Sequence, residues 1–221
     1  MRYLVLCLIF LVGFPSSATC GTRNPSVPDS KYINYGLKHK CVVPVKGDML
    51  IKNEDGKEIE VKASGSGVII NKRYVLTAAH VVKDIKKPYI ILNKKKIEIE
   101  WVVVPNKFKE KITGPYDIAL CKLHEDAIID FYPELYDKDD EIGKICSLAG
   151  WGMHGTWQTG TIYNDNKLRA GSNYVDPIMF YGMLVCSVQD KSKRTSLEFL
   201  IGRGDSGGGL FIDQKLAGIH S

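Results

Sequence analysis

Short runs of β-forming residues alternate with turn-forming residues along most of this chain, and this pattern limits its fold more than any other feature. The runs at 65–70 and 73–78 flank a turn at Asn71, and the run at 97–104 alternates polar and apolar side chains. The last two runs predict a hairpin around Asp213, whereas helical periodicity is weak throughout. Many short strands joined by turns predict an all-β sandwich or barrel.

The composition is that of a chain with a real hydrophobic core. It has 221 residues, of which 44% are hydrophobic, so it is long enough for one large all-β domain or two small ones. The net charge of +5 is spread over short basic runs rather than gathered on one face. These runs are interpreted as solvated surface, and we expect no nucleic-acid partner.

The N-terminus has the pattern of a secretory leader. Arg2 precedes an apolar run, Tyr3–Phe14, that is too short to span a bilayer as a helix. Pro15 and the small residues up to Ala18 follow it. We therefore expect a signal peptide at 1–18 and a secreted protein. No later stretch could span a membrane, so no membrane partner is expected.

Export would make disulfide bonds possible in the mature chain. Of the six cysteines, Cys7 lies in the leader and five remain. Those five are Cys20, Cys41, Cys121, Cys146 and Cys186. The odd number means that one thiol is free or has a partner elsewhere, and the connectivity cannot be read from the sequence.

Three stretches carry residues suited to nucleophilic catalysis. The run "TAAH" ends in His80, "DIAL" begins with Asp117, and "GDSGG" contains Ser206. A serine hydroxyl needs a neighbouring base to become a good nucleophile. Histidine suits that task because its pKa is near neutrality, and a buried carboxylate can orient its ring. The three residues are therefore a candidate catalytic triad.

The glycines around the serine suggest a site for a developing negative charge. Acyl transfer requires backbone N–H groups that point at the oxyanion of the tetrahedral intermediate. Gly204 can take the unusual backbone angles that this demands, and the N–H of Ser206 would be the second donor. Both residues are predicted to form an oxyanion hole.

Together, "GSGVIINKRYVLTAAHV", "DIALCKL", "CSLAGWG", "GDSGGGL" and "KLAGIHS" resemble the trypsin and chymotrypsin family of serine proteases. The resemblance implies an all-β fold of two antiparallel Greek-key β-barrels with the site between them. It implies a serine endopeptidase in which His80 is general base and acid, Asp117 orients it, and Ser206 is the nucleophile.

The same resemblance divides the chain. After the signal peptide, residues 19–40 are rich in Pro, Ser and Lys and predict an extended strap or tail. The first barrel, with His80 and Asp117, is expected at 41–135. The second barrel, with Ser206, is expected at 136–221, incomplete at its C-terminal end.

Two positions relate to substrate binding through the resemblance. Leu200 falls at the floor of the specificity pocket, which favours apolar side chains in the substrate, although Glu198 could provide an acid instead. Ser221 falls on the strand that supports the catalytic Asp and adjoins the substrate. Family members are activated by a cut whose new ammonium group pairs with the acid beside the serine, here Asp205. The usual cleavage motif is not found, so we expect another partner for that acid.

The chain ends where the family has a further strand and a helix, so we expect it, as given, to be poorly folded or weakly active. Two alternatives to an active enzyme stay open: a catalytically impaired homologue that acts as a binding or decoy protein, and a fragment of a longer active protease. The expected partners are protein or peptide substrates and protein inhibitors, and we expect a monomer with no metal and no cofactor.

Overall fold

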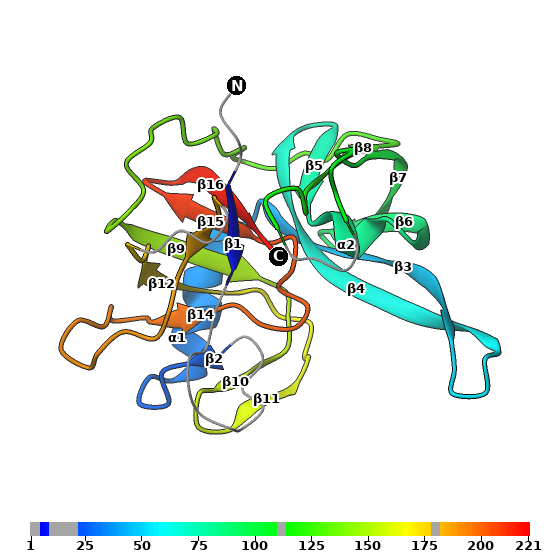
Figure 1. The fold of residues 1–221 in the computed structure, drawn as a ribbon. Coiled ribbons are helices and arrows are strands. Elements are labelled where there is room, and N and C mark those ends of the chain that lie inside the picture. The colour runs from blue at the N-terminus through cyan, green and yellow to red at the C-terminus, as the bar shows by residue number, and fades with distance from the viewer. Residues whose placement is uncertain (1–4, 9–21, 110–113, 178–181) are drawn as a thin grey trace.

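The computed structural model describes residues 5–8, 22–109, 114–177 and 182–221. Its strands form two units that lie side by side, a closed barrel and a second half made of two sheets (Figure 1). Within these ranges, no helix is both long and apolar enough to cross a membrane. The all-β fold expected from the alternation of strands and turns is therefore confirmed.

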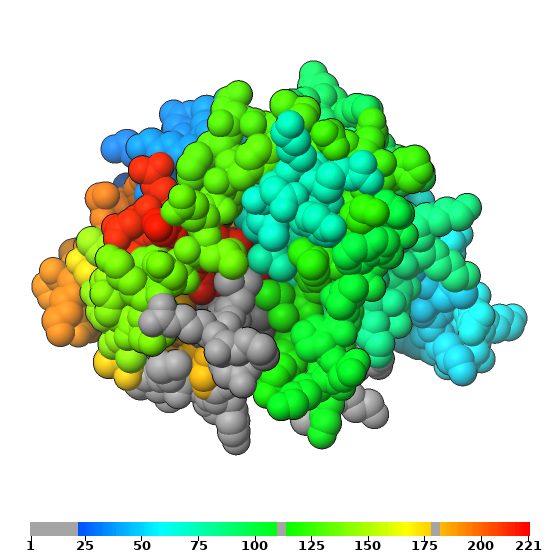
Figure 2. Space-filling model, turned by 90° about the horizontal axis from the view of Figure 1, so that it is seen from above, coloured from blue at the N-terminus to red at the C-terminus, as the bar shows by residue number. Residues whose placement is uncertain are grey.

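The closed barrel is antiparallel and holds six strands. In their order around the barrel they are β3 (Val42–Lys52), β4 (Glu58–Asn71), β5 (Tyr74–Thr77), β8 (Ala119–Leu123), β7 (Lys95–Val103) and β6 (Ile85–Leu92). The expected turn at Asn71 joins β4 to β5, where Asn71 pairs with Tyr74. Beyond the barrel, β3 and β4 continue as a two-stranded arm that projects from the molecule (Figures 1 and 2).

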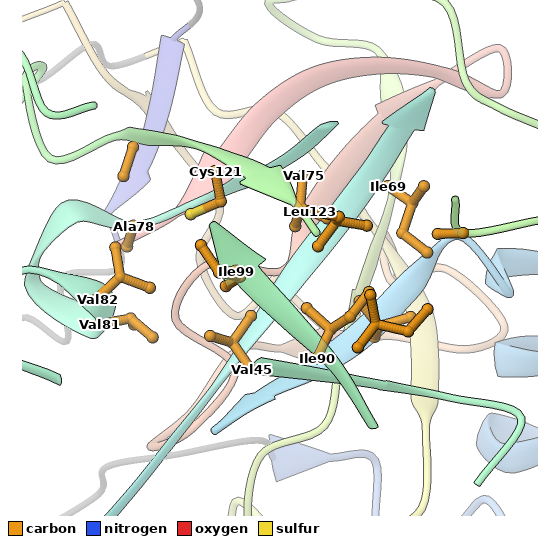
Figure 3. Close-up of a cluster of buried hydrophobic side chains, with 14 of the residues drawn as sticks. Val45, Ile69, Val75, Ala78, Val81, Val82, Ile90, Ile99, Cys121 and Leu123 are labelled. Carbon is orange, nitrogen blue, oxygen red and sulfur yellow. The ribbon is translucent and has the colours of Figure 1, made fainter. Parts of the chain in front are cut away.

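Aliphatic side chains from all six strands fill the barrel. Figure 3 shows Val45, Ile69, Val75, Ile90, Ile99 and Leu123 converging on its interior. Val81 and Val82 of the short helix α2 (Ala79–Val82) pack into the same cluster. The barrel core therefore fixes the backbone on both sides of His80.

The second half consists of a six-stranded and a four-stranded sheet. The first has the order β12 (Arg169–Tyr174), β9 (Ile145–Gly150), β15 (Gly209–Ile212), β16 (Lys215–His220), β1 (Val5–Leu8) and β13 (Leu184–Val185). The second has the order β11 (Gly160–Tyr163), β10 (His154–Thr156), β2 (Thr22–Arg23) and β14 (Phe199–Leu200). The expected hairpin is present, because β15 and β16 are joined by Asp213 and Gln214, both with positive φ.

Strand β1 lies beside β16 in this sheet and runs parallel to it (Figure 1). It also pairs in parallel with β13 on its other side. Its residues, Val5–Leu8, fall inside the segment that the sequence predicts to be a signal peptide. Of the apolar stretch at 182–188, only Leu184 and Val185 form a strand, β13.

The segment before the barrel is not the extended strap that its composition predicts. It forms helix α1 (Asp29–Gly36) and a short 3-10 helix, η1 (Leu37–His39), and α1 packs against β12. Arg169, only 3% exposed, donates two hydrogen bonds to Asp29 and two to Asp165, at 2.7–2.9 Å. This charge-assisted cluster, which the composition did not reveal, fastens α1 to the second half.

Candidate active site

His80 is placed by the end of β5 and by helix α2. Ala78 and Ala79, directly before it, are fully buried, whereas the imidazole is 43% exposed. The backbone N–H of His80 donates to Oδ1 of Asp117 at 2.9 Å. The ring is thus held at the surface by a buried backbone, where a ligand could reach it.

Asp117 lies just before β8 and is 3% exposed. Its Oδ2 accepts from Nδ1 of His80 at 2.6 Å and from Oγ of Ser221 at 2.5 Å. Burial raises the pKa of this carboxyl, but the hydrogen bonds from His80 and Ser221 outweigh it, so its pKa lies below the ordinary value. The carboxylate is therefore charged at neutral pH and can only accept. This fixes the proton of His80 on Nδ1 and leaves Nε2 able to take another.

Ser206 lies in a loop that touches both halves of the molecule. Its carbonyl accepts from the N–H of Ser66 on β4 at 2.8 Å, and the N–H of Gly207 donates to the carbonyl of His220 on β16 at 2.7 Å. Gly207 has a φ of +85°, and a side chain there would overlap Ser66 and Thr77. Only glycine allows this close approach to the barrel.

The loop also lies against the helix that carries His80. A side chain at Gly65 on β4 would meet both Val81 of that helix and the carbonyl of Ser206. Ser206 and His80 are therefore brought to the same part of the barrel wall. Among the described residues, no hydrogen bond joins Oγ of Ser206 to the His80 ring.

Backbone N–H groups of the serine loop divide into bonded and unbonded ones. Those of Asp205, Gly207 and Gly208 donate to backbone carbonyls at 2.7–2.8 Å. Those of Gly204 and Ser206 have no hydrogen-bond acceptor within the described ranges. Gly204 has a φ of +92°, which orients its peptide in a way that other residues rarely allow. The two unbonded N–H groups are the ones that the sequence singled out for an oxyanion hole.

Asp205 turns away from solvent and is 2% exposed. Its carboxylate accepts from the N–H of Gly152 and from that of Gly202, both at 2.8 Å. Burial raises its pKa to about 7, against the effect of these bonds and of Arg169. No ion pair to Asp205 is present in the part of the chain that the structure describes, so the cationic partner expected from the sequence is not found there.

Leu200 and Glu198, the two residues considered for the specificity pocket, are both buried. Leu200, 3% exposed, lies in β14 and its backbone pairs with Thr22 of β2. Glu198 is fully buried, and its carboxylate lies 3.0 Å from Nε of Arg194 and accepts from the N–H of Gln189. Glu198 thus has a cation beside it and is not a free acid, although burial still raises the pKa of its carboxyl above the ordinary value.

Ser66 is a residue of the candidate site that sequence reasoning missed. It is fully buried; its hydroxyl donates to the carbonyl of Gly204 at 3.0 Å and accepts from the N–H of Trp151 at 2.9 Å. It thereby connects the barrel to the loop that carries Ser206. The only signal in the sequence is a serine between two glycines, which does not reveal such distant partners.

Known proteins resemble this chain in both sequence and fold. A family model described as Trypsin matches residues 51–221. A trypsin of Simulium vittatum is 26% identical over an alignment 178 residues long that covers 70% of this chain and 68% of the relative. The alpha-fibrinogenase albofibrase of Trimeresurus albolabris is 27% identical over an alignment 215 residues long that covers 86% of this chain and 80% of the relative.

Two solved structures show the shared fold. Neuropsin, a serine protease of mouse brain, superposes with a TM-score of 0.59 at 19% identity, covering 89% of this chain and 84% of its own. An inactivated protease paralogue of the scabies mite gives 0.57 at 19% identity, covering 81% of each chain. These likenesses confirm the expected chymotrypsin-type fold.

Proposed function

Since this chain belongs to the trypsin family of serine proteases, we propose that it is a secreted endopeptidase that cleaves peptide bonds through an acyl-enzyme. The observation that carries the proposal is the hydrogen-bonded pair of His80 and Asp117. This pair lies by the same barrel wall as a loop whose Gly204 and Ser206 N–H groups are free to bind an anion.

In the proposed reaction, Oγ of Ser206 attacks the scissile carbonyl while Nε2 of His80 takes its proton. The imidazolium that forms is stabilised by Asp117, which already accepts from Nδ1. His80 then gives the proton to the departing amine. A water molecule attacks the acyl-enzyme in the same way and restores Ser206.

The N–H groups of Gly204 and Ser206 would bind the oxyanion of each tetrahedral intermediate. In such sites, one donor contributes roughly 3–4 kcal/mol to the stability of the transition state. The bond from Ser66 to the carbonyl of Gly204 helps to hold this peptide in place.

For substrates we propose proteins or peptides with an apolar residue at the site of cleavage. The support is that Leu200 is apolar and that Glu198 is paired with Arg194. Ser221, which supports Asp117, would lie along the substrate backbone. Peptide amides that differ only in this residue, leucine against lysine, test the preference, and faster cleavage after lysine would contradict it.

Export is the second part of the proposal. It is supported by the charged and apolar pattern of residues 1–18. N-terminal sequencing of protein collected from the medium of an expressing cell should give a chain that begins at Thr19. A secreted chain that keeps Val5–Leu8 would contradict removal of the leader.

A second function is favoured by two observations: Oγ of Ser206 is not bonded to His80 in the described structure, and Asp205 has no cation there. Both would be expected of a homologue that has lost catalysis and acts as a binding or decoy protein. One relative in fold is itself called an inactivated protease paralogue. The two functions differ in whether Ser206 is reactive.

A fluorophosphonate probe, which labels only an activated serine, separates them. We expect labelling of the folded chain, and loss of labelling in Ser206→Ala and His80→Ala. Ser64, an exposed serine on the same strand as Ser66, provides a matched control, because the Ser64→Ala variant should be labelled as strongly as wild type. Folded protein, with the circular dichroism of a β-protein, that never takes up the probe would favour the binding protein.

A further inference from the structure

Two buried thiols from separate parts of the second half lie against each other. Cys146 is in β9, Cys186 directly follows β13, and their Sγ atoms are 3.6 Å apart. They are 1% and 0% exposed. Because a disulfide needs its two sulfur atoms about 2.0 Å apart, only a small approach separates this pair from a bond.

The other cysteines with described side chains are arranged differently. Cys41 and Cys121 are buried in two other clusters, and neither sulfur contacts a second sulfur within the described ranges. Burial raises the pKa of each thiol to about 12, which makes them unreactive. Side chains of Cys7 and Cys20 lie outside the described part. Among the cysteines with described side chains, only Cys146 and Cys186 have their sulfur atoms side by side.

We propose that Cys146 and Cys186 form a disulfide bond in the mature protein. The oxidant is a low-molecular-weight or protein disulfide, such as glutathione disulfide. The thiolate of one cysteine attacks it, giving a mixed disulfide and one reduced thiol. The second cysteine then attacks the protein sulfur of that mixed disulfide. This releases a second reduced thiol, so two protein thiols are oxidised and one disulfide is reduced.

The burial of both sulfur atoms determines at which stage of folding they can be oxidised. A folded chain gives an external disulfide no access to either thiol, so the bond must form while the chain folds. Once formed, it is shielded from reductants by the side chains of the same cluster. These side chains include Leu148, Leu184, Phe199, Leu210 and Ile212. The bond is therefore a structural one and not a redox switch.

The sheet order shows what the bond would hold together. Among the described strands, β13 pairs only with β1, and β1 lies in the leader that we propose is removed on export. Near β13, hydrogen bonds then remain from Asp176 to the carbonyl of Val185 and from Asn173 to that of Ser187. A bond from Cys186 to Cys146 would connect this segment covalently to β9.

The same bond bears on the site. Strand β9 leads directly into Trp151 and Gly152, whose N–H groups hold Ser66 and Asp205. A fixed β9 therefore supports the oxyanion loop. The need for the bond to hold the segment around β13 rests on the proposed export, and its support of the oxyanion loop rests on the proposed catalysis. The pairing of the two sulfur atoms rests on neither.

The test is to fold the full chain in glutathione redox buffer, unfold it in urea, block the remaining thiols there by alkylation, and digest without reduction. Mass spectrometry should find the peptide of Cys146 linked to that of Cys186. In the folded chain, breaking the link should need a ratio of reduced to oxidised glutathione that is on the order of tenfold or more higher than the ratio that breaks it in urea. If the same ratio breaks the link with and without urea, the proposal is overturned.

Matched variants make the result specific. Cys146→Ala and Cys186→Ala should each abolish the link and expose one new alkylatable thiol, whereas Cys41→Ala and Cys121→Ala should keep it. A reductant should lower the urea concentration at the midpoint of unfolding for wild type and for Cys121→Ala alike. It should leave the midpoint of Cys146→Ala unchanged.

Two results would contradict the pairing. One is both thiols alkylated after folding under oxidising conditions, and the other is either cysteine linked to Cys20 instead. The link is read by mass, independently of fluorophosphonate labelling. A protein that carries the link but takes up no probe would therefore contradict the proposed enzyme activity and support the disulfide. A protein that takes up the probe but lacks the link would support the activity and contradict the disulfide.

Discussion

The Nδ1 atom of His80 lies 2.6 Å from Oδ2 of Asp117, and the backbone N–H of the same histidine donates to the other carboxylate oxygen at 2.9 Å. One buried carboxylate thus holds both the ring and the backbone of the proposed base. Asp117→Asn would present an amide N–H₂ to Nδ1, so the ring would carry its proton on Nε2, where it could not act as a base. We expect kcat to fall by about 10⁴-fold, as in serine proteases with this change.

The measurement is hydrolysis of a peptide ester that wild type cleaves, with Ser206→Ala as the baseline. Far-ultraviolet circular dichroism should be unchanged, because the amide still fits the site. A loss of less than about tenfold would show that Asp117 does not orient the base.

The buried carboxyl of Asp205 should make stability depend on pH. Its pKa is raised from 3.8 to about 7 in the folded chain, so the folded state binds a proton more tightly than the unfolded one. Its stabilising effect is complete below about pH 4 and is lost as the pH rises to about 7. Because a tenfold difference in proton affinity corresponds to about 1.4 kcal/mol, the total loss is a few kcal/mol.

Asp205→Asn tests this window by urea unfolding at pH 5 and pH 7. The variant should be less stable at pH 5 by about 1–3 kcal/mol, because its N–H₂ faces one of the two backbone N–H groups. It should also lose less stability than wild type between the two pH values. Equal losses would mean that a cation neutralises Asp205 in solution.

His220 should have the opposite pH dependence. Its ring is fully buried, and neither nitrogen makes a hydrogen bond of good geometry among the described residues. Burial lowers its pKa from 6.5 to about 3, against a smaller opposing effect of the Asp205 backbone. Since the folded state resists protonation, stability is lost as the pH falls from about 6.5 to about 3. His220→Leu should remove this loss of stability at acid pH and should stabilise the chain by about 1 kcal/mol at neutral pH.

Thermal unfolding of the His220 variant at pH 4.5 and pH 7.5 provides the check. Because Asp205 acts in the other direction over part of this range, the useful quantity is the difference between variant and wild type. A difference that does not grow toward pH 4.5 would show that the ring finds a partner in solution.

The buried guanidinium of Arg169 should contribute far more to stability than an exposed lysine on the same carboxylate. Arg169→Met leaves Asp29 and Asp165 without their main partner inside the protein, and we expect a loss of roughly 3 kcal/mol. Lys167→Met removes an exposed ion pair to Asp165 and should cost less than about 1 kcal/mol. Urea unfolding of both variants measures the contrast, and equal losses would show that α1 is not held by Arg169.

Local pattern was enough to predict several of the strands and turns, because alternation and turn residues act over a few neighbours. The turn at Asn71 and the hairpin at Asp213 are where the sequence predicts them. The prediction failed for the segment before the barrel. Its Pro- and Ser-rich composition favours extended chain, yet α1 is stabilised by Arg169, a partner remote in sequence.

By itself, the sequence determined the residue types of the candidate site and the class of chemistry that they permit, because His80, Asp117 and Ser206 stand in recognisable local motifs. Only the tertiary structure decided which groups meet. It joined Ser66 to the carbonyl of Gly204, paired Glu198 with Arg194, left Asp205 without a cation in the described residues, and set Cys146 beside Cys186. Such contacts depend on how strands distant in the chain pack together, and short-range pattern carries no information about them.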